Sequence, residues 1–154
     1  GGSLFDLGCY PLSYMRLLAG EPDFTSATGV LSADGVDLSA GAVLHFPQGI
    51  TGTFACDMQS FRAQDLDIRG TTGRIRLQTP FSIPKDQPVT IEYWHDDGYE
   101  EITIPAVNHY VLMLEDFAGA LLNNRSPRFP AGDAILQMET LEKLVAQAGA
   151  SPLP

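Results

Sequence analysis

Positive charge is scarce in this 154-residue chain, in which 9 Lys and Arg residues face 19 Asp and Glu residues for a formal net charge of −10. Affinity for a nucleic-acid backbone comes from clustered cations, so we expect no nucleic-acid partner. Long apolar runs are also missing, since no stretch approaches the ~20 residues that cross a bilayer. The first residues lack the basic and then apolar segments of a signal peptide. We therefore expect no membrane partner and a cytoplasmic location.

Cysteine is nearly absent as well. Cys9 and Cys56 are too few and too far apart for a disulfide framework or a Cys-x-x-Cys zinc site, so two reduced thiols are predicted, in line with the cytoplasm. The sequence also has no Gly-x-Gly-x-x-Gly motif opening a βαβ unit, which is the motif that cradles the pyrophosphate of a dinucleotide. We expect this chain by itself to bind no cofactor and no metal.

The first regular pattern predicts a helix. Apolar and aromatic residues recur at helical spacing, and Gly20 followed by Glu21-Pro22 is a typical helix end. These residues are Leu7, Tyr10, Tyr14, Leu17 and Leu18. Pro11 conflicts with the pattern, because a proline beyond the first turn removes a backbone hydrogen bond and clashes with the preceding turn. The helix therefore either begins near Gly8 or begins earlier and bends at Pro11.

Residues 23–105 change to short β-type runs separated by Gly, Pro and Asp. Turn signals at Pro47-Gln48-Gly49, at residues 70–73 and at residues 95–98 each lie between two runs and predict hairpins. About seven strands are expected: Phe24–Ser32, Leu38–Phe46, Ile50–Met58, Leu66–Arg69, Arg74–Gln78, Val89–Trp94 and Tyr99–Ile104. Successive hairpins pair antiparallel and no βαβ alternation occurs, so the sheet should be open and largely antiparallel.

Two apolar stripes at helical spacing follow in the last third. The first spans about residues 111–122, and the second spans about residues 135–148 and ends at Gly149. The chain is thus predicted to be a single α+β domain over residues 1–154. Its open antiparallel sheet of about seven strands carries the N-terminal helix and the two C-terminal helices on one face. The other face needs a cover, often a second copy or a second domain.

Three blocks of the sequence resemble one known family. The first is Gly1-Gly2-Ser3-Leu4-Phe5-Asp6-Leu7-Gly8-Cys9-Tyr10-Pro11, in which paired glycines precede Asp-x-Gly-x-Tyr. The second is Asn108-His109-Tyr110 with Glu115-Asp116-Phe117 and Asn123-Asn124-Arg125-Ser126-Pro127. The third is Phe46-Pro47-Gln48-Gly49 with Gly70-Thr71-Thr72-Gly73-Arg74. Together they resemble the C-terminal domain of the glucose–fructose oxidoreductase / inositol dehydrogenase (Gfo/Idh/MocA) family, nearest to the branch with glucose–fructose oxidoreductase, dimeric dihydrodiol dehydrogenase and xylose dehydrogenase.

The resemblance implies a cofactor and partners. Family members bind NAD or NADP, with NADP slightly favoured here, in an N-terminal Rossmann domain. A sugar, polyol or diol substrate lies between that domain and the C-terminal one, and members commonly form homodimers through the open sheet face. This chain lacks the Rossmann domain and the lysine of its Glu-Lys-Pro motif, because Lys85 and Lys143 stand in no such motif. We expect a C-terminal domain separated from its cofactor domain and inactive alone.

By the same resemblance, Tyr10 would exchange a proton with the substrate hydroxyl or carbonyl, Asp6 would support it, and Asn108 and His109 would contact the substrate. The residues alone support the first pair, because positions i and i+4 share a helix face. Hydride transfer to a carbonyl leaves an alkoxide, and a phenol can supply its proton. Without the family, Asp6 is an N-cap or first-turn acid, Tyr10 a core-edge aromatic and His109 a helix cap.

Two other functions stay open. One is a non-enzymatic dimerisation or small-molecule-binding module that acts through the open sheet. The other is a hydrolase, which needs two carboxylates about 5–10 Å apart, such as Asp6 and Asp57. Nothing in the sequence places that pair together. His45 is expected to be an ordinary sheet residue, and His95, which stands beside Asp96-Asp97, to lie at a solvated hairpin tip and not at a metal site.

Overall fold

A computed structural model describes residues 1–150 of the chain. They form two compact units, which are described separately: the first joins Gly1–Phe61 with the chain from Phe129 onward, and the second is Arg62–Arg128. Three α-helices and seven strands, all paired antiparallel, confirm the predicted α+β class. The strands are divided between a three-stranded sheet of order β1-β2-β3 and a four-stranded sheet of order β4-β5-β6-β7.

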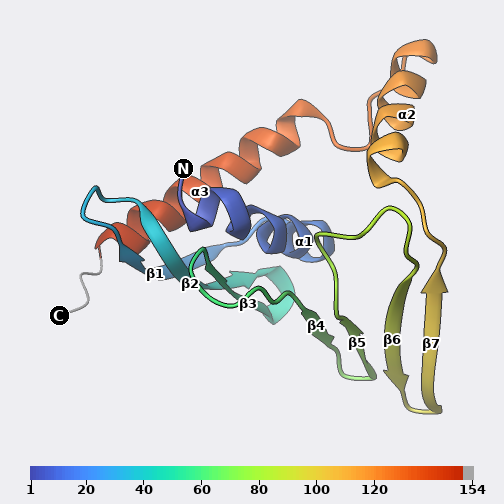
Figure 1. Ribbon diagram of the computed structural model, residues 1–154, viewed down its shortest axis with the longest axis horizontal. Coiled ribbons are helices and arrows are strands. Elements are labelled where there is room, and N and C mark those ends of the chain that lie inside the picture. Colours follow the sequence, from blue (N-terminus) through green and yellow to red (C-terminus); the bar gives the residue numbers. More distant parts are fainter. Residues whose placement is uncertain (151–154) are drawn as a thin grey trace. The chain divides into compact units, whose positions relative to one another are not determined.

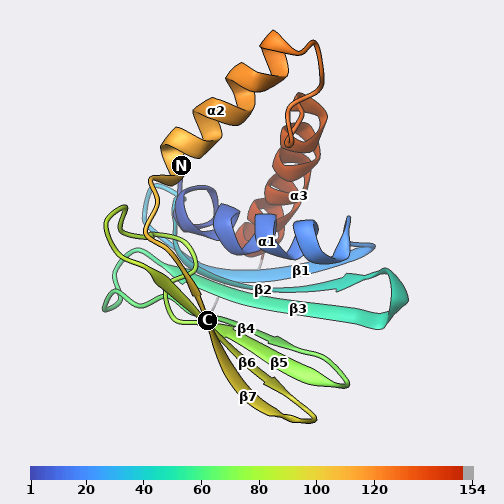
Figure 2. The same cartoon turned by 90° about the vertical axis from the view of Figure 1, so that its right-hand side faces the viewer.

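The first unit is a sheet covered on one face by helices. Its elements are a π-helical turn (Leu4–Gly8), α1 (Cys9–Ala19), β1 (Phe24–Leu31), β2 (Asp37–Phe46), a 3-10 turn (Pro47–Gly49), β3 (Ile50–Asp57) and α3 (Ala131–Ala150). Figures 1 and 2 both show α1 and α3 on the same face of the three strands. The helix cover predicted for one sheet face is therefore present in this unit.

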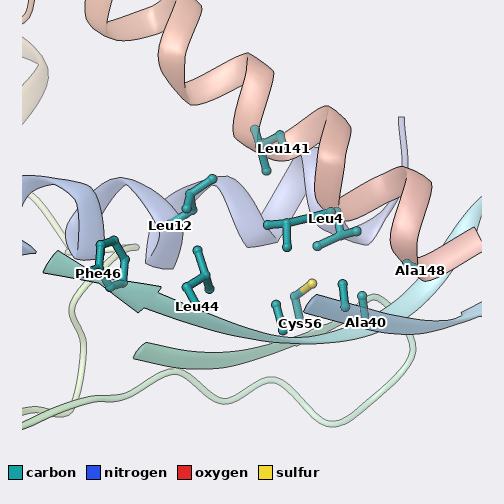
Figure 3. Packing of buried hydrophobic residues seen from close by; sticks show 11 residues of the cluster. Leu4, Leu12, Ala40, Leu44, Phe46, Cys56, Leu141 and Ala148 are labelled. Atoms are coloured by element: carbon teal, nitrogen blue, oxygen red, sulfur yellow. The ribbon is translucent and has the colours of Figure 1, made fainter. Parts of the chain in front are cut away.

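Strand alternation explains the core of the first unit. Alternate residues of β2 point toward the helices and are buried, namely Ala40, Ala42, Leu44 and Phe46. The π-helical turn and α1 add Leu4 and Leu12, and α3 adds Leu141, Leu144 and Ala148. Figure 3 shows these side chains meeting between the helices and the strands. Burial of such side chains contributes roughly 1.5–3 kcal/mol for each large one. Ile135 and Met138, which belong to the same predicted stripe, stay 60% and 44% exposed.

The backbone accommodates Pro11 through a change of helix type. Helical structure begins at Leu4 as a π-helical turn and becomes α-helical only at Cys9. Pro11 is therefore the third residue of α1, within the first turn, where backbone N–H groups have no partner inside the α-helix. Both sequence alternatives hold in part: the helix begins early, and its α-helical part begins next to Gly8.

The second unit contains β4 (Leu66–Arg69), β5 (Gly73–Leu77), β6 (Val89–His95), β7 (Gly98–Ile104) and α2 (His109–Leu122). Residues opposite each other in an antiparallel pair share a face, so the register separates two surfaces. One is apolar and includes Leu66, Ile68, Ile75, Leu77, Val89, Ile91, Tyr93, Ile102 and Ile104. The other is polar and includes Asp67, Arg69, Arg74, Arg76, Glu92, Trp94, Tyr99 and Glu101. Across residues 1–150, no helix has the length and apolarity needed to span a membrane.

Candidate functional site

The segment that carries the predicted catalytic pair is pressed against the three-stranded sheet. Leu4 and Gly8 lie on its buried side. A Cβ atom on Gly8 would lie 3.2 Å from side-chain atoms of both Leu4 and Phe54, and 3.4 Å from the Cys56 sulfur. The glycine of Asp-x-Gly-x-Tyr thus allows the helix to approach the sheet closely. This close approach fixes which side of the helix faces away from the core.

Asp6 and Tyr10 lie on the opposite, solvent-facing side of this helix. Asp6 is exposed, and Tyr10 is 51% exposed. Asp6 stands in the first turn of the π-helical segment, where the N-cap residue is Ser3. The prediction that Asp6 is a first-turn acid is therefore confirmed, and the alternative that Asp6 is the N-cap is wrong. Tyr10 is half-exposed, which agrees with a core-edge position, and both side chains are accessible to solvent.

Asp37, the first residue of β2, anchors the start of this helix. Its Oδ2 atom accepts hydrogen bonds from the Ser3 hydroxyl at 2.8 Å and from the Leu4 backbone N–H at 2.7 Å. The residue is only 6% exposed. A methyl group on Gly2 would overlap the same carboxylate. The second glycine of the pair at the start of the chain is therefore required by the space that Asp37 occupies.

The sequence gives little indication that Asp37 is important. Alternation along β2 buries the even-numbered residues from Ala40 onward, which would turn residue 37 outward. The register with β1 shifts, however: Val30 pairs with Ser39, while Leu31 pairs with Asp37. Such a β-bulge redirects side chains, and here it places Asp37 on the inner face beside the helix start.

Arg16 holds the other end of α1. Its side chain is 3% exposed and donates to both carboxylate oxygens of Glu21, to Asp133 Oδ1 at 2.9 Å and to Gln137 Oε1 at 2.9 Å. The hydrogen bonds to Glu21 raise the pKa of Arg16, and they outweigh the burial of the guanidinium group, which by itself would lower that pKa. Gln137 also donates to the Cys9 carbonyl at 2.8 Å, so α3 contacts the residue next to Tyr10.

The predicted substrate-contact residues belong to the second unit. Asn108 is the N-cap of α2, and its side-chain oxygen accepts from the Tyr110 backbone N–H at 3.1 Å. His109 is exposed, and its ring lies against that of Tyr110 with centroids 4.2 Å apart. The cap predicted as one role for His109 is thus supplied by Asn108. The catalytic pair and the predicted contact residues lie in different units.

His45, Asp57 and His95 each have a structural partner. His45 lies in β2 within 3.0 Å of the Thr51 hydroxyl, as an ordinary sheet residue. Asp57 accepts hydrogen bonds from the Gln59 and Ser60 backbone N–H groups, which lower its pKa. His95 ends β6 and stacks on Tyr93. Among the residues that the structure describes, no group of three His, Cys, Asp or Glu side chains is suited to a metal ion.

Both cysteines are free thiols, as predicted. Burial raises the pKa of Cys9 and of Cys56, and the negative charge of Asp6 raises that of Cys9 further. A raised pKa keeps a thiol protonated and weakly nucleophilic. Cys9 therefore offers little nucleophilic chemistry at the site, although it adjoins Tyr10 in sequence.

A polar pocket of about 380 Å³ lies in the second unit. The side chains of Gln78, Thr90, Glu92 and Glu101 line it, together with a proline-rich loop. One carboxylate oxygen of Glu92 is buried and has no hydrogen-bond partner among the described residues. The pocket is acidic and does not include any predicted site residue.

Comparison with known proteins finds similar oxidoreductases. A family model described as the GFO/IDH/MocA C-terminal domain matches residues 1–76, which include the anchored helix and the three-stranded sheet. Over these residues the chain is similar to the C-terminal domain of the GFO/IDH/MocA family. D-xylose 1-dehydrogenase (NADP(+)) 2 of Haloferax volcanii is 28% identical over 149 residues, which cover 96% of this chain and 46% of the relative. Trans-1,2-dihydrobenzene-1,2-diol dehydrogenase of Sus scrofa is 33% identical over 95 residues, covering 60% of this chain and 28% of the relative.

Solved structures with the same fold match nearly the whole chain. A 3-ketoreductase from Actinomadura kijaniata, in complex with NADP and TDP-benzene, is 26% identical and matches with a TM-score of 0.84. The match covers 96% of this chain and 46% of that one. The chain thus spans about half the length of these two proteins, the xylose dehydrogenase and the 3-ketoreductase.

Proposed function

We propose that this chain is the substrate-side domain of an NAD- or NADP-dependent oxidoreductase that acts on a hydroxyl or carbonyl group of a sugar, polyol or diol. The observation that carries the proposal is the exposed Asp6–Tyr10 pair on a helix whose other side is buried against the sheet. The names of the relatives, which are sugar and diol dehydrogenases and a ketoreductase, support the substrate class, and two of those names specify NADP.

In this proposal Tyr10 exchanges the proton. The cofactor, held by a separate dinucleotide-binding domain, supplies or takes the hydride. The Tyr10 phenol donates a proton to the oxygen of a carbonyl substrate as negative charge develops there, and it takes the proton back in the oxidation direction. Asp6, one turn earlier on the same face, accepts a hydrogen bond from a substrate hydroxyl or orients the phenol. Substrate contact by Asn108 and His109, which the family resemblance implies, stays a prediction.

The test compares Tyr10→Phe, Asp6→Asn and Tyr14→Phe in the full-length protein that carries this chain. We expect Tyr10→Phe to lower kcat for NADPH-dependent reduction of a panel of aldoses and diketones by about 10²–10⁴-fold, as loss of a general acid does. Tyr14→Phe, which removes the same hydroxyl one turn later, should leave kcat unchanged. Full activity in Tyr10→Phe would contradict the proposed role.

The chain alone should bind NADPH weakly and show no dehydrogenase activity, because it contains no pyrophosphate-binding motif. Fluorescence titration of the isolated chain with NADPH measures this. Binding in the micromolar range or tighter would show that a cofactor site lies within residues 1–154.

The proposal includes a homodimer that forms through the outer face of the three-stranded sheet. In the alternative, a non-enzymatic module, this dimerisation is the whole function. Among the described residues of these strands, Asp57 is the only Asp, Glu, Lys or Arg on that face, which carries Phe24, Ser26, Thr28, Val30, Ser39, Val43, His45, Thr51, Thr53, Ala55 and Asp57. A solvent-facing sheet ordinarily carries charge, whereas a face of this kind suits packing on a second sheet. Light scattering should show a dimer that Thr53→Arg converts to a monomer. An unchanged dimer would mean that the interface lies on another surface.

The proposal also places the protein in the cytoplasm.

A further inference from the structure

We infer that Asp37 is a positioning residue for the proton transfer assigned to Tyr10: it fixes the start, and so the orientation, of the helix that presents Asp6 and Tyr10. The inference rests on the proposed function, because it gives the anchored helix a catalytic task. Asp37 itself touches no reacting group. It acts through Gly2, Ser3 and Leu4.

One carboxylate replaces the usual local cap of this helix. Ser3 is the N-cap residue, yet its hydroxyl makes no hydrogen bond to the helix backbone and donates to Asp37 instead. The Leu4 N–H, which has no partner within the helix, donates to the same oxygen. The negative charge of Asp37 also complements the positive end of the helix dipole. A residue 34 positions away in sequence thus performs the capping.

Burial makes this cap difficult to replace. Ser3 and Leu4 are fully buried, and Asp37 is nearly so. Water cannot easily take over either hydrogen bond when the carboxylate is removed, so the buried hydroxyl and N–H would lose their partner. The Cys56 thiol, 3.5 Å from the Ser3 oxygen, closes the cluster on the side of β3.

The anchor reaches the catalytic pair through the backbone. The Gly2 carbonyl accepts the Asp6 backbone N–H at 3.0 Å, and Gly2 lies directly against the Asp37 carboxylate. Asp6 is therefore one hydrogen bond away from a residue that Asp37 holds in place. Tyr10 follows on the same uninterrupted helical segment. Loss of the anchor would let the first turn fray and rotate, which displaces both side chains.

The test uses Asp37→Ala and Asp37→Asn in the full-length protein, with Asp34→Asn as the matched control. Asp34 is exposed in the preceding turn, so its variant removes the same charge without touching the helix. Misplacement of a reacting group by 1 Å can cost 10²-fold, so we expect Asp37→Ala to lower kcat by roughly 10–100-fold. Asp37→Asn, which keeps an acceptor oxygen, should lie between Asp37→Ala and wild type. KM for NADPH should change less than about twofold, because the cofactor binds a different domain.

A second variant isolates the contact and keeps the test decisive if Asp37→Ala fails to fold. Gly2→Ala should lower kcat on its own, and much less in the Asp37→Ala background, where the methyl group has room. All rates are measured well below each variant's Tm. Amide exchange of residues 4–10 should be faster in the Asp37 and Gly2 variants than in wild type. Unchanged kcat in both Asp37→Asn and Gly2→Ala would overturn the inference, as would an equal loss in Asp34→Asn. If Tyr10→Phe is fully active, the proposed function fails; if only the Asp37 and Gly2 variants are fully active, the positioning role alone fails.

Discussion

Replacement of Arg16 by methionine should be among the most destabilising changes on the surface of α1 that faces α3. The variant keeps an unbranched side chain in the same space but removes every donor of the guanidinium group. Glu21, Asp133 and Gln137 then each lose a hydrogen-bond partner. Asp133 and Gln137 both belong to α3, so the variant removes every hydrogen bond that Arg16 makes to α3. It leaves the hydrogen bond from Gln137 to the Cys9 carbonyl.

The size of the effect follows from how exposed the partners are. Removal of one member of a fully buried ion pair costs about 3–5 kcal/mol. The side chains of Glu21 and Asp133 are 46% and 42% exposed, so water compensates part of their loss. We therefore expect Arg16→Met to lower the free energy of unfolding by roughly 2–3 kcal/mol and Tm by roughly 4–12 °C.

Urea unfolding followed by far-ultraviolet circular dichroism measures the cost, and amide exchange in α3 reports the first unit separately. Arg69→Met is the matched control, because it removes the same charge from a side chain that is 75% exposed in the second unit. Its cost should stay below about 1 kcal/mol. A cost for Arg16→Met below about 1 kcal/mol, or no larger than that of the control, would refute the reasoning.

Three further predictions concern individual side chains. The hydrogen bond from the Tyr99 hydroxyl to Glu101 raises the pKa of Tyr99 to about 12, so its stabilisation is present below pH ~10 and lost as pH rises through 12. Ultraviolet titration of Glu101→Gln against a Tyr99→Phe reference should show that pKa return toward about 10, and an unmoved value would contradict the contact. Two arginines hold the pKa of Asp67 well below its usual range, so Asp67→Asn should destabilise the protein at pH 7 and progressively less as pH falls below about 4, in chemical unfolding at several pH values. A cost that does not change with pH would exclude this linkage. Leu12→Ala should cost about 2–5 kcal/mol in thermal unfolding, whereas exposed Leu17→Ala should stay near 0.5, and equal costs would mean that the core lies elsewhere.

The hairpins and helices are the part of this fold that the sequence predicts best, because their signals are local. The turns at residues 47–49, 70–73 and 95–98 each join the expected strands, whose ends differ by at most one residue from the structure. The division into two sheets is not predictable in this way. Alternation fixes which face a side chain occupies but not which strand is its neighbour, so nothing local tells whether β4 pairs with β3.

The candidate site shows the same division between local and long-range information. Spacing places Asp6 and Tyr10 on one helix face, and both are exposed there. Helical periodicity also groups Ile135 with the buried stripe of α3, although this residue, near the start of the helix, is 60% exposed. Asn108 rather than His109 caps α2, because the Asn side chain is short enough to reach the Tyr110 N–H.

The two buried charges that sequence periodicity does not predict sit at opposite ends of the helix that carries Tyr10. Asp37 meets the start of this helix, and Arg16 stands in its last turn. Each sign complements the helix dipole at its own end, so both charges stabilise the helical state as well as its position. Asp37 lies in β2, and Arg16 pairs with Asp133 of α3, so the two charges tie the helix to two other elements. A helix fixed at both ends can turn only with difficulty, and this rigidity is what the proton transfer proposed for Tyr10 would require.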